Sequence, residues 1–315
     1  MKRILTAGLL LLFVQLGMAQ QEGQFTQFMY NQLSVNPAYA GSRGFPSLMA
    51  LYRGQWLGFK GAPKNSQASF NAPLFGDRVG FGLTVANNDL GITNSWNITM
   101  AYSYNIPLSE KNSLRFGIQG NIRQLGIDFA DPSAIIRETG DPSIQENMNT
   151  NQTTGNFGVG AYFTGEKFYA GVSVPHLYPT EFSFNGDPSL PLVAQESPHF
   201  YGIVGTLIPI KNNLDFKPSV LVKYVENAPV DLDVNLSFVF NKEVHIGASY
   251  RMGGDGAAES VDLTALYQVS NLGFGIAYDF TLSDISQFSN GSFEAMVRYD
   301  FIKERTDMAN PRFFF

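Results

Sequence analysis

Residues 95–107 read Ser-Trp-Asn-Ile-Thr-Met-Ala-Tyr-Ser-Tyr-Asn-Ile-Pro and alternate large apolar side chains with small or polar ones along their whole length. In a β-strand, successive side chains point to opposite faces, so a pattern with period two predicts a strand. One face would carry Trp96, Met100 and Tyr104, and the other would carry Asn97 and Ser103. The stretch is therefore predicted to be a strand with one apolar and one polar face.

The same alternation recurs along the chain from residue 47 onward. We expect about fourteen strands, an even number as in bacterial outer-membrane barrels. They are predicted at residues 47–58, 64–74, 79–88, 95–107, 113–126, 155–164, 168–174, 199–209, 214–225, 230–240, 244–252, 260–269, 272–281 and 292–302. Many runs have about 9 to 13 residues, longer than most globular strands and close to what a tilted strand needs to cross a bilayer.

Short and long connections alternate between these strands. The short ones are predicted at residues 76–78, 109–112, 165–167, 211–213, 241–243 and 270–271, and the long ones at 59–63, 89–94, 127–154, 175–198, 226–229, 253–259 and 282–291. Short periplasmic turns and long external loops are typical of outer-membrane barrels. A soluble β-sandwich would show the same side-chain alternation, but strand length and loop rhythm favour the membrane. We predict an all-β transmembrane antiparallel barrel with both termini on the turn side.

The first residues have the pattern of a secretory signal peptide: Lys2 and Arg3, an apolar run, and the small-residue site Gly17-Met18-Ala19. No later segment is long and apolar enough for a membrane-spanning helix. We therefore expect a signal peptide at 1–19, a periplasmic or plug-like segment at 20–46, the barrel at 47–303 and a tail at 304–315. Export through a cleaved signal peptide to the outer membrane is the predicted localisation.

Composition excludes several functions. The chain has no cysteine, so disulfides, a lipid anchor on cysteine and thiolate metal sites are excluded. A net charge of -6 offers no basic surface for nucleic acid. His176, His199 and His245 are scattered without metal-like spacing, and no nucleophile motif or phosphate-binding loop is present. We predict a non-enzyme without cofactor or metal.

Two features of the predicted polar face concern the barrel interior. Charges of both signs fall there, and they would either line a pore or form a packed polar network, which we favour. These charges are Arg53, Arg115, Arg123, Asp215, Lys217, Lys223, Asp231, Asp233, Arg251, Asp262, Glu294, Arg298 and Asp300. Glycines also recur with period two, as at Gly80 and Gly82 or Gly158 and Gly160, which indicates close packing or strong curvature.

Three motifs near the start carry a resemblance to a known family: Gln-Phe-Thr-Gln-Phe-Met-Tyr-Asn at 24–31, Asn-Pro-Ala-Tyr-Ala-Gly at 36–41, and Tyr-Arg-Gly-Gln-Trp-Leu-Gly-Phe-Lys-Gly-Ala-Pro at 52–63. With these motifs the chain resembles the PorP/SprF family of the type IX secretion system. The resemblance implies an outer-membrane barrel that is not an enzyme. Its implied partners are the periplasmic ring of the machinery, a peptidoglycan-binding adaptor and adhesin-like cargo, and it also implies a link to gliding motility.

Motif and placement together give the candidate site residues. For contact with a partner or with the barrel we expect Phe25, Gln27, Tyr30, Asn31, Asn36, Pro37, Tyr39 and Gly41, and for anchoring in the first strand Arg53, Gln55 and Trp56. The segment before the barrel could fold into the barrel mouth or meet a periplasmic protein. Two other functions are considered: a passive transporter of small hydrophobic molecules, which would conduct or take up substrate, and a hydrolase, which would need a clustered nucleophile and base.

Overall fold

The computed structural model describes residues 23–129, 131, 149–183, 192–226, 228–253 and 257–302. The expected signal peptide (1–19), the tail (304–315) and most of the expected loop at 127–154 therefore lie outside the described residues. In the part that is described, no helix is both long and apolar enough to cross a membrane.

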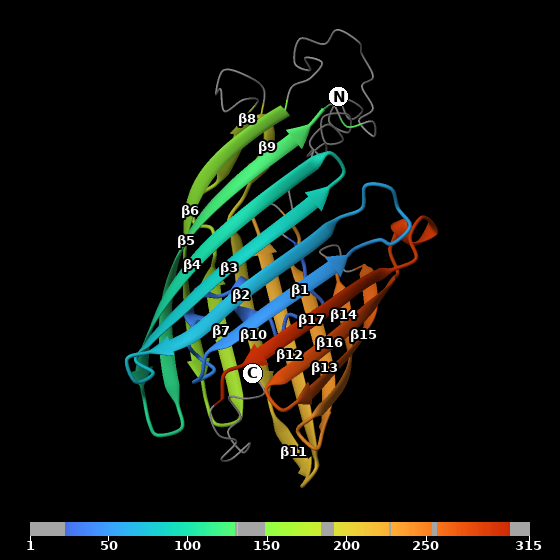
Figure 1. The fold of residues 1–315 in the computed structure, drawn as a ribbon. Coiled ribbons are helices and arrows are strands. Elements are labelled where there is room, and N and C mark those ends of the chain that lie inside the picture. The colour runs from blue at the N-terminus through green and yellow to red at the C-terminus, as the bar shows by residue number, and fades with distance from the viewer. Residues whose placement is uncertain are drawn as a thin grey trace, which may run out of the picture.

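The described strands close into a fourteen-strand antiparallel barrel (Figure 1). Each strand pairs with its neighbour along the chain, and β10 pairs with both β7 and β12, which joins the two ends of the sheet. The short β11 continues β10 beyond Leu207 and pairs with the same neighbour, β12. The wall strands are β1 (Ser47–Gly54), β2 (Lys64–Leu74), β3 (Val79–Leu90), β4 (Thr93–Pro107), β5 (Ser113–Asp128), β6 (Asn149–Thr164), β7 (Phe168–Val174), β10 (His199–Thr206), β11 (Ile208–Lys211), β12 (Leu214–Val225), β13 (Asp231–Phe240), β14 (Val244–Met252), β15 (Ala258–Val269), β16 (Leu272–Thr281) and β17 (Ser292–Asp300).

The predicted fold class is confirmed, since a wall strand lies at each of the predicted positions. The strands differ from the prediction mainly on the side of the long connections, which we call the loop side; the opposite end is the turn side. β6 begins at Asn149, before the predicted start at 155. The long connection after β7 also contains a small hairpin, β8 (Thr180–Ser183) and β9 (Leu192–Glu196).

The first strand is shorter than predicted, which corrects the placement of Gln55 and Trp56. β1 ends at Gly54, opposite Lys64 at the start of β2. Trp56 has a φ of 51°, outside the range of a strand. The backbone N–H of Leu57 instead donates to the carbonyl of Gly291, so this connection docks against the loop between β16 and β17. Gln55 and Trp56 therefore belong to the loop side rather than to the strand.

The expectation that both ends lie on the turn side holds only for the C-terminal end of the described chain. Ile302 accepts a hydrogen bond from Asn271 in the turn between β15 and β16. Gly23, at the other end, lies against Asn65 near the loop-side end of β2. The reason is that residues 23–46 run through the lumen from the loop side before β1 begins on the turn side.

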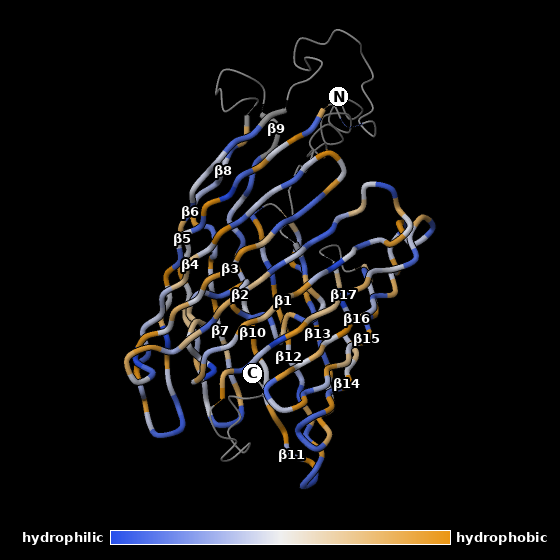
Figure 2. Tube along the Cα trace, viewed as in Figure 1, coloured by the Kyte–Doolittle hydropathy of each residue, from blue (hydrophilic) through white to orange (hydrophobic). Residues whose placement is uncertain are grey.

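Apolar and polar residues separate between the two faces of the wall. Figure 2 shows hydrophobic and hydrophilic residues alternating along the strands. Large apolar side chains such as Met100, Ile118 and Ile122 are exposed on the outer face, whereas Ser103 and Arg115 are buried inside. An exposed apolar belt of this extent is stable in lipid but not in water. The wall is therefore built to cross a membrane.

Candidate functional site

The lumen is occupied by the protein's own N-terminal segment, residues 23–46, which we call the plug. Its backbone forms tight turns and two 3-10 helices, η2 (Gln32–Ser34) and η3 (Pro37–Tyr39). A third 3-10 helix, η5 (Asp284–Gln287), lies outside the plug, in the loop before β17. Met29 and Ala40 of the plug are fully buried. The plug is therefore an internal part of the barrel's core.

Asn36 and Pro37 determine how the centre of the plug is shaped and held. The side-chain oxygen of Asn36 accepts from the backbone N–H of Ala38 at 2.9 Å, and Pro37 begins η3, where a missing N–H costs nothing. The side-chain nitrogen of Asn36 donates to the carbonyls of Ala161 and Val172, on β6 and β7. One asparagine thus caps the turn and attaches it to the wall.

Glycines on the inner wall make room for the plug backbone. A Cβ on Gly117 would lie 2.2 Å from the nitrogen of Ala38, and one on Gly80 would lie 2.0 Å from the carbonyl oxygen of Ala40. Gly41 of the plug has a φ of 71° and lies against Gly80. The glycine spacing in the sequence therefore marks the places where plug and wall meet.

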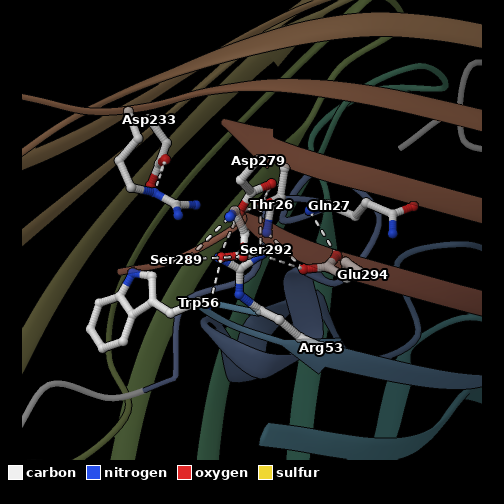
Figure 3. A network of polar contacts seen from close by, with 11 residues as sticks. Thr26, Gln27, Arg53, Trp56, Asp233, Asp279, Ser289, Ser292 and Glu294 are labelled. Carbon is white, nitrogen blue, oxygen red and sulfur yellow. Dashed lines mark hydrogen bonds and ion pairs between the residues drawn. The ribbon is translucent and has the colours of Figure 1, made fainter. Parts of the chain in front are cut away.

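A buried ionic cluster holds the loop-side end of the plug (Figure 3). Arg53 of β1 forms ion pairs with Asp279 of β16 at 2.6 Å and with Glu294 of β17 at 3.4 Å. The hydroxyl of Thr26 accepts a hydrogen bond from Arg53 and donates one to Asp279, each at 2.8 Å. Glu294 accepts the backbone N–H groups of Thr26 and Gln27 at 2.9 and 3.0 Å. Three neighbouring strands and the plug thus share one polar network.

Further contacts hold the rest of the plug. Arg43 forms an ion pair with Asp300 at 3.1 Å near the turn side. The Tyr30 hydroxyl is hydrogen bonded to His245, and the Lys217 amine lies 4.7 Å from the centre of the Tyr30 ring. Burial raises the pKa of Tyr30 above its usual range, so the phenol stays neutral. The plug is thus attached to the wall near both of its ends and in its middle.

The structure gathers most of the predicted site residues between plug and wall. The buried ones are Gln27, Tyr30, Asn31, Asn36, Pro37 and Tyr39, with Gly41 packed on the wall. Phe25 is half-buried, Arg53 joins the ionic cluster, and Gln55 and Trp56 line a cavity. The sequence reasoning did not single out Thr26 or Asp279. The period-two pattern of residues 272–281 places Asp279 on the same face as Gly275 and Ala277, so its inward orientation could have been found.

Between the plug and the long loops lies a cavity of about 500 Å³. Phe25, Leu33 and Val35 of the plug line its floor, and most of its wall residues come from β2 to β5. At one edge, Glu196 forms an ion pair with Arg123 at 2.9 Å, and its carboxylate also lies 3.4 Å from Nδ1 of His176. We call this space the loop-side cavity.

The barrel, its plug and the motifs that form the plug can now be compared with known proteins. Residues 17–299 match the family described as Type IX secretion system membrane protein PorP/SprF. The chain belongs to the PorP/SprF family. The suspected family is thereby confirmed, and PorP/SprF membership together with the barrel fold places the protein in the outer membrane. This family and fold are those of a secretion or transport barrel rather than of an enzyme.

Several solved proteins are similar to this PorP/SprF protein at a low level, while no curated protein matches its sequence. The Acinetobacter baumannii outer membrane protein Omp33 has 7% identity over 82% of this chain and 98% of its own, with a TM-score of 0.47. A Pseudomonas aeruginosa FadL homologue has 12% identity, 91% and 96% coverage and a TM-score of 0.47. The Ralstonia pickettii toluene transporter TbuX has 10% identity, 90% and 96% coverage and a TM-score of 0.46. These values support no transfer of function.

The wall glycines give a direct test of plug seating. Gly117→Ala should destabilise the folded barrel by about 1–3 kcal/mol or displace the plug, because the added methyl group overlaps the plug backbone. Gly120→Ala on the same strand is the matched control, since its Cβ comes no closer than 4.0 Å to the Phe157 ring. The measurement is unfolding in lipid vesicles, followed by the loss of gel mobility typical of a folded barrel. Equal stability of the two variants would contradict close seating of the plug.

The ionic cluster predicts a large effect of losing its cation. Arg53→Leu leaves Asp279 and Glu294 buried without their partner, and removing one member of a buried ion pair costs about 3–5 kcal/mol. Arg53→Lys keeps the charge and should recover part of the loss. Lys111→Ala, which breaks the exposed Lys111–Glu166 pair, should leave the unfolding free energy unchanged. If Arg53→Leu were as stable as Lys111→Ala, the cluster would not anchor the plug.

Proposed function

We propose that this PorP/SprF barrel is a closed docking component of the type IX secretion system in the outer membrane, and that it binds other proteins at its two ends. The observation that carries the proposal is the plug. It is fixed by Arg53, Asp279 and Glu294 near one end and by Arg43 and Asp300 near the other. Because the plug occupies the lumen, a folded cargo has no path through the barrel. We therefore assign protein binding to the exposed ends of the barrel.

The turn side is the proposed meeting place with the periplasmic ring and a peptidoglycan-binding adaptor. By the arrangement usual in outer-membrane barrels, short turns face the periplasm. The described chain ends on this side, where the carbonyl of Ile302 accepts a hydrogen bond from the side chain of Asn271. This geometry supports docking through the tail and the turns.

The loop side is the proposed contact surface for exported cargo, including adhesin-like proteins and their surface attachment, with a link to gliding motility. β5 and β6 have 16 residues each, whereas β7 and β10 have 7 and 8. Figure 1 shows β5 and β6 extending beyond neighbouring strands on this side. A raised rim of paired strands offers a rigid surface to a protein outside the membrane.

The family motifs at 24–31 and 36–41 act, in this proposal, by holding the plug rather than by touching a partner. Their side chains face the wall: the Asn31 amide pairs with Gln67, and Asn36 bonds β6 and β7. A substitution in these motifs would therefore affect docking only indirectly, through the shape of the barrel ends.

The closed lumen can be tested by electrical recording. In a planar lipid bilayer the full-length protein should show no steady conductance, because the plug fills the lumen. Removal of residues 24–41 should open a conducting path, provided that the variant still shows the gel mobility of a folded barrel. Gly120→Ala is the non-conducting control. Steady conductance of the full-length protein, or its uptake of hydrophobic substrate into vesicles, would instead support a passive transporter.

The docking role is tested by recovery of partners from native outer membranes. The tagged full-length protein should retain type IX ring, adaptor or adhesin proteins, and removal of residues 303–315 should reduce the ring and adaptor proteins selectively. Glu110→Gln, an exposed change in a turn, is the matched control on the same side. If the barrel were recovered alone, and if its absence left the secreted proteins of the cell unchanged, the secretion role would be wrong.

A further inference from the structure

We propose that the loop-side cavity is a binding site for an uncharged saccharide chain. This inference is independent of the docking role, since it concerns a site above the plug and not the two protein-binding ends. It begins with the polar side chains that line the cavity. Within the described residues, the side-chain amides of Asn65, Asn88 and Asn97 make no hydrogen bond to the protein, and neither does that of Gln55.

These amides match the chemistry of sugar hydroxyls. Each amide offers a carbonyl acceptor and an NH₂ group with two donors. A hydroxyl group both donates and accepts, so adjacent hydroxyls on a sugar ring can pair with both ends of one amide. Asn65, Asn88 and Asn97 lie on the three consecutive strands β2, β3 and β4, which pair with one another along the cavity wall. Register places Asn65 opposite Asn88, so their amides come from neighbouring positions.

The charges around the cavity favour an uncharged ligand. Glu196 is paired with Arg123, so the charges of these two side chains offset each other. Asp89 accepts a hydrogen bond from Asn94 on the adjacent strand. A phosphate or the carboxylate end of a peptide would have to break these contacts and lose the hydration of its own charge. A neutral, hydroxyl-rich chain meets no such penalty.

Aromatic rings complete the site. Trp56 lines the cavity where the chain leaves β1, Phe25 lies in the floor, and Tyr201 of β10 also lines it. The CH groups on one face of a sugar ring pack against aromatic rings, while its hydroxyls point sideways to polar groups. Trp56 has a positive φ and lies outside the strand, and in this position it lines the cavity.

The shape of the cavity limits how a ligand can enter. The plug closes the floor, and Trp56, Pro63, Leu90 and Thr93 lie at its loop-side end. A polymer cannot pass through, but the end of a chain fits, and about 500 Å³ is within the usual size of ligand sites. An apolar molecule of the same size would leave the amides without hydrogen bonds. The geometry thus favours the terminal rings of a saccharide.

Two sources can supply such a chain on the loop side of an outer membrane: the polysaccharide of a lipopolysaccharide and a free oligosaccharide. The fluorescence of Trp56 can report on both. The chain has 2 tryptophans, and the second, Trp96, is exposed on the outer face. In the Trp96→Phe protein, purified in detergent as the full chain, Trp56 is the single indole. Polysaccharide released by mild acid from the bacterium's own lipopolysaccharide and maltohexaose are the two probes.

The expected result is a saturable change in Trp56 emission with at least one probe. A response to the released polysaccharide alone would identify a lipopolysaccharide source, and a response to maltohexaose as well would identify a general oligosaccharide site. Asn65→Ala combined with Asn97→Ala should weaken binding about tenfold or more, since two hydrogen-bonding partners are lost. Ser66→Ala, next to Asn65 but on the outer face, is the matched control and should bind as before.

Gel mobility of the folded barrel, measured for every variant, separates loss of binding from loss of folding. The proposal is overturned if neither saccharide changes the emission of a folded Trp96→Phe protein. It is also overturned if the double asparagine variant binds as tightly as Ser66→Ala, or if a neutral peptide of comparable length saturates the site while both saccharides fail.

Discussion

Closure of the sheet, by the pairing of β10 with both β7 and β12, is the constraint on which the other features of this protein depend. In lipid every backbone N–H and carbonyl must be satisfied within the protein, and an open sheet would leave two rows of them unpaired. Closing a sheet of this size encloses a space that its own side chains do not fill. The chain fills that space with residues 23–46, and the seating of this plug then determines the character of the inner wall.

The inner wall meets the plug in two ways that have different physical origins. Where the plug backbone comes closest, the wall has glycines, as at Gly80 and Gly117, because a side chain there would overlap the plug. Where polar groups of the plug would otherwise be buried unpaired, the wall supplies charges, as at Glu294 and Arg53. Buried charges are costly unless they are paired and hydrogen bonded, so each of these contacts stabilises the closed lumen only in the presence of the others.

The plug divides the lumen into two parts. The turn-side half of the lumen is closed by the plug, whereas the loop-side half keeps a cavity with amide side chains and aromatic rings. In the proposed docking role, a barrel with this arrangement contributes surfaces rather than a passage. The proposed partners would bind at the turn side and the loop side, which are held apart by a wall that the plug contacts near both of its ends and in its middle.

The strand pattern, the antiparallel order and the family can be predicted from the sequence alone, because period two, the alternation of turns and loops, and the motifs are local properties of the chain. It also marked the inner glycines and the motif residues, such as Asn36 and Arg53, without showing that they meet. β1 ends earlier than the sequence predicts, because Gln55 and Trp56 continue the apparent alternation although the Leu57–Gly291 contact on the loop side holds this segment in another conformation.

Three features become visible only in the folded molecule: the plug lies inside the barrel, Thr26 reaches Asp279, and the described chain starts on the loop side. These contacts join residues more than two hundred positions apart, and no local pattern encodes which inward-facing charge will meet which part of the plug. The loop-side cavity likewise cannot be found from a local sequence pattern. Asn65, Asn88 and Asn97 are ordinary polar positions in three consecutive strands, and the cavity that they line exists because the plug lies in the lumen beside them.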